Sequence, residues 1–178
     1  MPVQHELELV FPTRQVARPI ICEMARVTDV VFSLSRASIS HQQGRMLLTL
    51  TGEPDPVRQA EAFFRNAGVA VMVTAEHMVD AADVPDVPRC EPVRPDLPTV
   101  ERKLWLTISA ETIDRPVLWE MSRRFDVVFD VRQSSIGRDV GIVGLLLRGP
   151  VDEVDGACDF LAELGIEIEP IEKSVIES

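Results

Sequence analysis

The residues of this chain whose types and spacing suit ligand chemistry are short polar side chains on two matching segments. Serine hydroxyls donate and accept hydrogen bonds, an ionised aspartate attracts an ammonium group, and arginine binds carboxylates. Side chains two positions apart on a strand share one face, so these groups would act together. Such a set suits the ammonium and carboxylate of an amino acid. The candidate ligand-binding residues are Ser33, Ser35, Ser38, Asp130, Arg132 and Ser135.

The same residues also have an interpretation without a ligand. Antiparallel sheets commonly pack one face on the core and leave the other in water, which produces alternating polar and apolar residues. Ser38 and Ser135 could satisfy backbone groups at a strand end. Asp130 and Arg132 could pair with each other. Both interpretations stay open at the level of sequence.

Catalytic and metal-binding patterns are not indicated. The three histidines and three cysteines are widely spaced, with no CxxC pair, so neither a metal site nor a disulfide framework is expected. The sequence has no HExxH segment and no glycine-rich phosphate loop. We therefore expect a protein that is not an enzyme and that uses no metal and no cofactor.

Charge and apolar patterning exclude further classes of protein. The net charge of −11 repels phosphate backbones, so no nucleic-acid partner is expected. The longest apolar stretches, such as residues 142–147, are too short to span a bilayer, and no membrane insertion is expected. The first residues include Glu6 and Glu8 and no apolar run, and cysteines are few, which favours a cytoplasmic location.

The elements that must position the candidate residues come in two copies. Residues 18–32 read RPIICEMARVTDVVF, and residues 115–129 read RPVLWEMSRRFDVVF. Equivalent residues from 7–71 and 104–168 stand 97 positions apart without a gap, as Arg18 does from Arg115. A repeat of this kind needs a structural cause. We infer two copies of one domain.

Each copy has the pattern of a β-α-β-β-α-β unit. In the first copy, alternating apolar residues from Leu7 to Phe11 indicate a strand, and Pro19 lies near the start of a helix. Two β-rich segments, residues 29–39 and 46–51, a second helix and a short strand follow. The fold class is therefore α+β, with two ferredoxin-like domains that form a pseudo-dimer.

The repeat also predicts the domain boundaries. We expect the first domain over residues 1–73, the second over residues 104–171 and an acidic tail over residues 172–178. Residues 74–103 hold five prolines and many acidic residues, which favours an extended linker without regular structure. A linker of this length allows the domains to pair side by side or back to back.

The repeated sequence resembles the NIL domain. The resemblance rests on the segment beginning RPVLWEM and ending FDVVF, on Ser134-Ser135-Ile136, on a strand that ends in Gly and on the closing LGIE. It covers nearly all of both copies and leaves out the linker and tail. It implies a ferredoxin-like, ACT-like module of the kind found at the C-terminus of methionine-import ATPases. In those members, paired domains bind methionine at their interface and shut the transporter down.

The resemblance draws attention to the position just after the DVVF segment. The family is named after an Asn-Ile-Leu string there, whose Asn contacts the ligand in the transporter members. Here the string reads Ser33-Leu34-Ser35 and Asp130-Val131-Arg132, so both copies lack the Asn. The chain also lacks an ATP-binding loop and an iron–sulfur cysteine run. The resemblance therefore implies a free-standing double sensor or adaptor.

We expect a non-catalytic regulatory protein that binds a small amino acid, methionine or a related sulfur amino acid first, at the seam between two NIL-like domains. Binding would change how the domains dock and so alter contact with a protein partner. A ligand-free protein–protein adaptor is one alternative. A tandem ACT-type regulator is another, although the connections after each copy's first strand lack the glycine that ACT ligand loops often carry. Homo-oligomer formation is also open.

Overall fold

The computed structural model describes residues 1–12, 18–39, 43–92 and 96–171, so the predicted tail at 172–178 lies outside the described residues. Both copies form the predicted β-α-β-β-α-β unit. The elements of the first domain are β1 (Val3–Phe11), α2 (Ile20–Val27), β2 (Val31–Ile39), β3 (Gly44–Gly52), α3 (Pro54–Asn66) and β4 (Ala70–Met78). Those of the second are β5 (Thr99–Ser109), α4 (Val117–Arg124), β6 (Val128–Ile136), β7 (Val140–Pro150), α5 (Val151–Glu163) and β8 (Glu167–Pro170).

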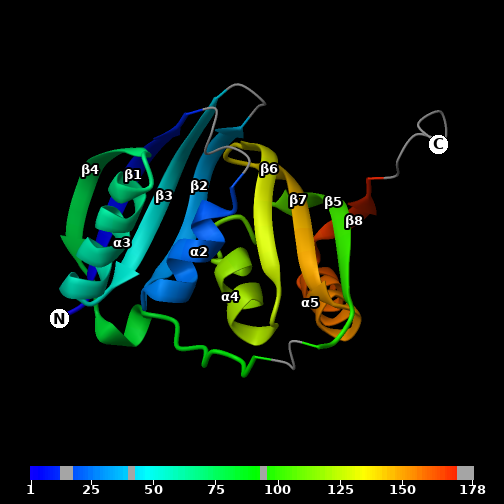
Figure 1. Ribbon diagram of the computed structural model, residues 1–178. Helices are drawn as coiled ribbons and strands as arrows, with labels where there is room; N and C mark the ends of the chain where they lie inside the picture. Colours follow the sequence, from blue (N-terminus) through cyan, green and yellow to red (C-terminus); the bar gives the residue numbers. More distant parts are fainter. Residues whose placement is uncertain (13–17, 40–42, 93–95, 172–178) are drawn as a thin grey trace.

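The two domains pair side by side and share one sheet. The sheet has eight antiparallel strands in the order β4-β1-β3-β2-β6-β7-β5-β8. The domains join through a short ladder in which Ser38 pairs with Ser135 and Ile39 with Ser134. All four α-helices cover one face of this sheet (Figure 1), and no described helix covers the other face, which we call the open face. The predicted α+β fold with a pseudo-dimer of two ferredoxin-like domains is confirmed.

The core lies between the sheet and the helices. Alternation along β1 and β5 turns Leu7, Leu9, Leu104 and Leu106 toward the helices, with at most 4% of each side chain exposed. Fully burying a side chain of this size contributes about 1.5–3 kcal/mol to folding. Each helix of the repeat presents an apolar stripe to these strands, so the two cores are built in the same way.

The seam between the domains is a continuation of both cores. The ring centroids of Phe32 on β2 and Phe129 on β6 lie 5.9 Å apart in a stacked arrangement. Each domain's first helix also contacts the other domain's strand, α2 against β6 and α4 against β2. Each domain's first helix therefore packs against a strand of the other domain. The two hydrophobic cores are continuous across the seam.

Two β-bulges lie next to the seam, at equivalent positions. The register of β2 on β3 shifts between Leu34 and Arg36, and that of β6 on β7 shifts between Val131 and Gln133. The extra residues are Ser35 and Arg132. A bulge bends its strand and increases the local twist. Beside these two bulges, β2 and β6 pair over only two residues of each strand.

The prediction that residues 74–103 lack regular structure is wrong at both ends. Strand β4 continues to Met78, which pairs with Val3, and β5 begins at Thr99, which pairs with Pro150. Each strand continues because its neighbour still offers unpaired backbone groups beyond the expected end. Between them the described chain holds only a short 3-10 helix at Ala81–Asp83.

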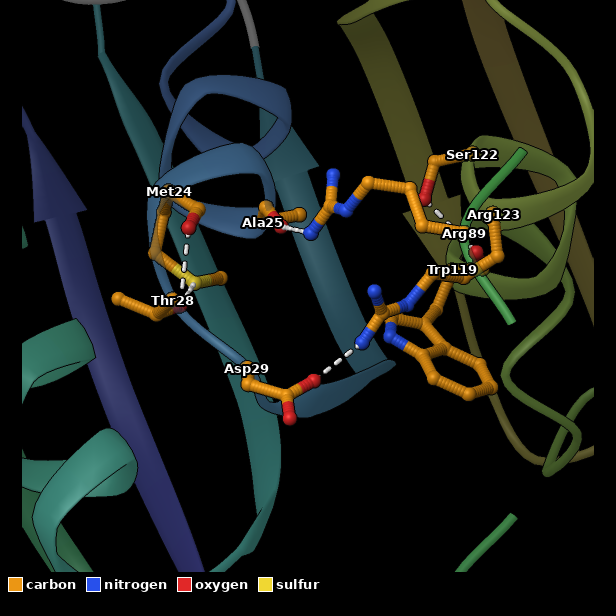
Figure 2. A network of polar contacts seen from close by, with 8 residues as sticks. All are labelled: Met24, Ala25, Thr28, Asp29, Arg89, Trp119, Ser122 and Arg123. Carbon is orange, nitrogen blue, oxygen red and sulfur yellow. Dashed lines mark hydrogen bonds and ion pairs between the residues drawn. The ribbon is translucent and has the colours of Figure 1, made fainter. Parts of the chain in front are cut away.

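The linker fastens the ends of the two seam helices. The Arg89 guanidinium donates to the carbonyl oxygen of Ala25 over 2.7 Å, and the Cys90 N–H donates to the carbonyl oxygen of Arg123 over 2.6 Å. Figure 2 shows the contact of Arg89 with Ala25 and the ion pair of Arg123 with Asp29 of the other domain, over 2.5 Å. The linker thus satisfies carbonyls that a helix C-terminus leaves without intrahelical partners.

None of the described helices has the length and apolar character needed to cross a membrane.

Candidate functional site

Two pockets lie at the seam, each built from both domains. The first, which we call the Asp130 pocket, combines β1 and the start of α2 with Phe129, Asp130 and Val131 of β6. The second, the Ser33 pocket, combines β5 and the start of α4 with Phe32, Ser33 and Leu34 of β2. All ten residues that line the Asp130 pocket have their counterpart, 97 positions away, in the Ser33 pocket. The pockets are therefore related by the pseudo-symmetry of the repeat.

The pocket walls are mainly apolar. In the Asp130 pocket the apolar residues are Phe11, Pro19, Ile20, Ile21, Ile39, Met46, Phe129 and Val131. Each cavity measures about 20 Å³, which is space for about one water molecule. A ligand as large as an amino acid therefore has to widen the pocket that it enters.

The two pockets differ in the residue that follows the seam phenylalanine. Asp130 occupies this position in one pocket and Ser33 in the other. Asp130 is 7% exposed, although it lies on the open-face side of β6. Its Oδ2 accepts a hydrogen bond of 3.1 Å from Nη1 of Arg132, whose side chain is 47% exposed. A carboxylate that is buried this far needs a cationic or hydrogen-bonding partner.

Burial raises the pKa of Asp130 above its ordinary value of 3.8, while the guanidinium groups of Arg132 and Arg148 oppose the rise. Desolvation disfavours the ionised carboxylate, and a nearby cation restores it. The Asp130 pocket consequently favours a positively charged group beside the carboxylate. Perturbed pKa values of this kind concentrate at functional sites.

A polar hollow of about 120 Å³ adjoins the Asp130 pocket and shares Pro19 and Asp130 with it. Its other lining residues are Val128, Arg132, Leu146 and Arg148. One anion and two cations thus meet at the mouth of an apolar cavity. The equivalent positions in the first domain hold Ser33, Ser35 and Thr51, which carry no charge. Of the two equivalent sets of residues, only the set around Asp130 is therefore charged.

The six predicted site residues do not form one cluster. Asp130 and Arg132 lie together at the polar hollow, and Ser33 lines the other pocket. Ser35 is exposed on its bulge, with Oγ 3.3 Å from Oγ1 of Thr49. Ser38 and Ser135 are exposed register partners in the β2–β6 ladder. These two serines therefore belong to the joint between the domains rather than to either pocket.

Several residues of the seam were not predicted from the sequence. Arg18 and Arg115 line equivalent pockets, and each pairs over 2.7 Å with a glutamate of its own helix, Glu23 or Glu120. The sequence feature that could have identified these two arginines is the Arg-Pro dipeptide, which occurs in both copies. Ser134 is 9% exposed, and its hydroxyl has no partner among the described residues. No repeat marked it, because alanine occupies the equivalent position 37.

Within the described ranges, no group of three or more His, Cys, Asp or Glu residues is arranged to hold a metal ion.

Comparison with known proteins assigns the repeated unit. The model of the NIL domain matches the chain twice, at residues 6–73 and 103–170. A search among curated proteins finds no match.

Solved structures give only general likenesses. The chain is similar to aminoacylhistidine dipeptidase from Vibrio alginolyticus, at 13% identity and a TM-score of 0.39, over 96% of this chain and 39% of that one. It is similar to an unknown protein from Galdieria sulphuraria, at 12% identity and a TM-score of 0.33, over 98% and 100% of the two chains. The chain is also similar to the acetolactate synthase small subunit from Thermotoga maritima, at 14% identity and a TM-score of 0.24, over 96% of this chain and 99% of that one.

The family assignment rests on the NIL match. The matched segments include both seam pockets and all or part of each of the six elements in both βαββαβ units. Because the NIL model covers most of the chain and matches it at both repeats, the protein belongs to the NIL domain family and carries two NIL domains in tandem.

Proposed function

We propose that the protein is a non-catalytic regulator that senses one amino acid in the Asp130 pocket. The observation that carries this proposal is a buried carboxylate between an apolar cavity and two arginines, at a seam to which both domains contribute. The tandem NIL domains support a regulatory, ligand-sensing role. Three free cysteines support a cytoplasmic location as part of the same proposal.

The polar groups suggest how the ligand is held. The ammonium of an amino acid would take the place of the Arg132 guanidinium at Asp130. The freed Arg132 would then bind the ligand carboxylate, and Arg148 across the hollow, which pairs with Glu101 over 2.9 Å, would add positive charge. Arginine suits this role because its planar donors match a carboxylate. The ligand side chain would enter the apolar cavity between Phe11, Met46 and Phe129.

The lining of the cavity favours an unbranched apolar side chain. Met46 and Ile39 line a cavity with room for about one water, so a slender, flexible side chain requires the least widening. Methionine and related sulfur amino acids have this shape, and a thioether makes favourable contacts with aromatic rings such as Phe129. We therefore place these amino acids first among the ligands.

A ligand that widens the pocket would regulate by changing how the two domains dock. The wall on one side is the start of α2 in the first domain, and on the other it is β6 in the second. A ligand that enters between them must separate these elements. A ligand shifts an equilibrium only through different affinities for the two states, and here the state with the domains further apart would bind more tightly. A partner protein would sense the altered docking.

The unequal pockets predict one ligand per chain. The Ser33 pocket has the same apolar walls but lacks the carboxylate and both arginines of the other side. A zwitterion that entered it would lose its hydration without ionic partners, which is costly. Binding should therefore saturate at one molecule for each protein chain.

A thermal-shift screen with the twenty amino acids, homocysteine and cystathionine tests the proposal. A ligand that binds only the folded state stabilises it by about 2.7 kcal/mol at a hundredfold excess over Kd. Titration calorimetry with the best compound should give a stoichiometry of one. Asp130→Asn should abolish the shift, and the matched variant Ser33→Ala should preserve it.

Two results would count against the proposal. If no compound shifts the melting temperature, the sensor hypothesis fails and an adaptor without a ligand replaces it. If Ser33→Ala weakens binding as much as Asp130→Asn does, both pockets bind and the role of the carboxylate is wrong.

A further inference from the structure

The open face of the sheet differs in character between the two domains. In the second domain Trp105, Ile142 and Leu146 lie on this face, and Ile142 is 43% exposed. The equivalent residues of the first domain are Glu8, Arg45 and Thr49. Glu8 and Arg45 form an ion pair of 3.5 Å. Because the same fold is built with polar residues at these positions, the fold does not require the apolar ones.

A hollow of about 290 Å³ marks the centre of this apolar surface. It is lined mainly by Lys103, Trp105, Arg132, Gln133, Gly144 and Ile171. Gly144 is the register partner of Trp105, and a Cβ atom built there would lie 3.1 Å from the indole ring. Leu47 takes the place of this glycine in the first domain. The hollow is therefore a feature of the second domain alone.

Charged residues flank the apolar centre in a regular way. Across the strands, one row of the open face runs from Gln133 on β6 through Gly144 and Trp105 to Glu169 on β8, with Arg132 on the bulge beside Gln133. In another row Arg148 on β7 lies beside Glu101 on β5, at 2.9 Å. In these two rows the cations Arg132 and Arg148 lie on β6 and β7, and the anions Glu101 and Glu169 lie on β5 and β8.

We propose that a second copy of this chain docks on the open face of the second domain. A twofold axis parallel to the strands, between β7 and β5, would exchange β7 with the partner's β5 and β6 with the partner's β8. Trp105 would then face the strand position of the partner's Gly144, and because each indole already lies over the Gly144 of its own chain, the two indoles would pack against each other at the axis. Such an interface is isologous, with each contact made twice.

The charges are self-complementary under this axis. Arg148 meets the partner's Glu101, and the Arg132 flank meets the partner's Glu169. In the row between them, Lys103 faces the partner's Leu146, so no like charges oppose each other in these rows. Two sheets that stack in this manner lie about 10 Å apart, with side chains interdigitated. An aromatic residue at the centre with a polar rim is the usual anatomy of an interface hot spot.

Sedimentation velocity of the full chain over a wide range of concentrations tests the proposal. Wild-type protein should approach twice the chain mass of 19.8 kDa. The double variant Trp105→Glu/Ile142→Arg transfers the Glu8–Arg45 pair of the first domain to the second. It should fold, because the same scaffold holds that pair already, and its dimer Kd should rise by about 30-fold or more. The matched control Glu8→Gln/Arg45→Gln should leave the Kd unchanged.

A charge swap tests the position of the axis. Glu101→Arg alone should weaken the dimer, because it places a cation opposite the partner's Arg148. Adding Arg148→Glu in the same chain should restore the dimer, since both the internal and the cross-chain pairs are re-formed in reverse. Circular dichroism and the melting temperature of each variant report whether it folds.

Three outcomes would overturn the proposal. A wild-type chain that stays monomeric at every concentration would leave this face to a different partner. A dimer that survives Trp105→Glu/Ile142→Arg would use another surface. If the Glu101→Arg/Arg148→Glu chain dimerises no better than Glu101→Arg alone, the proposed axis is excluded.

Discussion

At the scale of single residues, the difference between Asp130 and Ser33 separates two otherwise equivalent pockets. The sequence showed that the copies diverge at this position and that an aspartate there would attract an ammonium group. It did not show that the carboxylate is 7% exposed or that Arg148 lies across the hollow. Burial depends on residues from β7 and from α2 of the other domain, and their proximity cannot be seen from local patterns.

The raised pKa of Asp130 predicts a specific pH dependence of stability. The folded state keeps the Asp130 proton to a higher pH than the unfolded state does, so the free energy of unfolding falls as pH rises from about 3.8 through the raised pKa. Above this range Asp130 costs stability. Asp130→Asn removes the ionisation while Asn still accepts the Arg132 hydrogen bond, so it should raise the melting temperature at pH 7.

Melting temperatures of wild type and Asp130→Asn from pH 3 to pH 8 check this prediction, and their difference isolates the titration of one group. The gain should shrink as the pH falls below the raised pKa. Asp139→Asn, in the exposed turn before β7, serves as the control and should show no such trend. A gain that is independent of pH would contradict the assigned cause.

At the scale of elements, the ends of the second helices show how closely the domains repeat each other. Gly68 and Gly165 follow α3 and α5 with φ angles of 88° and 84°. In α5 the N–H of Gly165 donates to Ala162 and that of Ile166 to Leu161, which is the Schellman arrangement. The sequence predicted these glycines because a local rule governs a helix end. It missed the bulges at Ser35 and Arg132, which depend on pairing between strands.

Gly165→Ala should destabilise the fold by about 1 kcal/mol, because a left-handed backbone is strained for a residue with a Cβ atom. The free energy of unfolding from urea titration measures the loss. Gly137→Ala is the control, since a Cβ atom there meets nothing closer than 3.8 Å and should change stability little. Equal effects of the two substitutions would show that the φ angle of Gly165 is not the cause.

At the scale of the whole molecule, the two domains form one structural unit. They share a sheet, stack Phe32 on Phe129 and cross their first helices over each other's strands. Arg123 pairs with Asp29 across the seam, and Arg26 donates to the carbonyl oxygen of Val127 over 3.0 Å. The linker joins the same region through Arg89. Separate unfolding would expose apolar surface on both domains.

We therefore predict a single unfolding transition. Trp105 and Trp119 both lie in the second domain, so tryptophan fluorescence reports that domain, whereas far-ultraviolet circular dichroism reports both. The two signals should coincide through a urea titration. Phe32→Ala, in the first domain, should move both by about 3–5 kcal/mol, because it leaves a cavity beside Phe129.

Met72→Ala is the control for the seam variant. Met72 is 62% exposed on the edge strand β4, far from the seam in strand order, and its loss should change neither signal appreciably. Two separated transitions in the wild type, or a Phe32→Ala effect confined to circular dichroism, would show that the domains unfold independently.

The sequence by itself determined the repeated β-α-β-β-α-β fold, the family and the position at which the two copies diverge. These follow from local periodicity, helix-end chemistry and a constant spacing of 97 residues, all of which act over short stretches of chain. Only the tertiary structure decided that the domains lie side by side, that each pocket is lined by both of them and that the open face is apolar in one half. The reason is that docking depends on packing between residues about a hundred positions apart. The pairing of Ser38 with Ser135 and the stacking of Phe32 on Phe129 are such contacts. No local pattern specifies them, and together they bring Asp130 to the pocket that α2 completes.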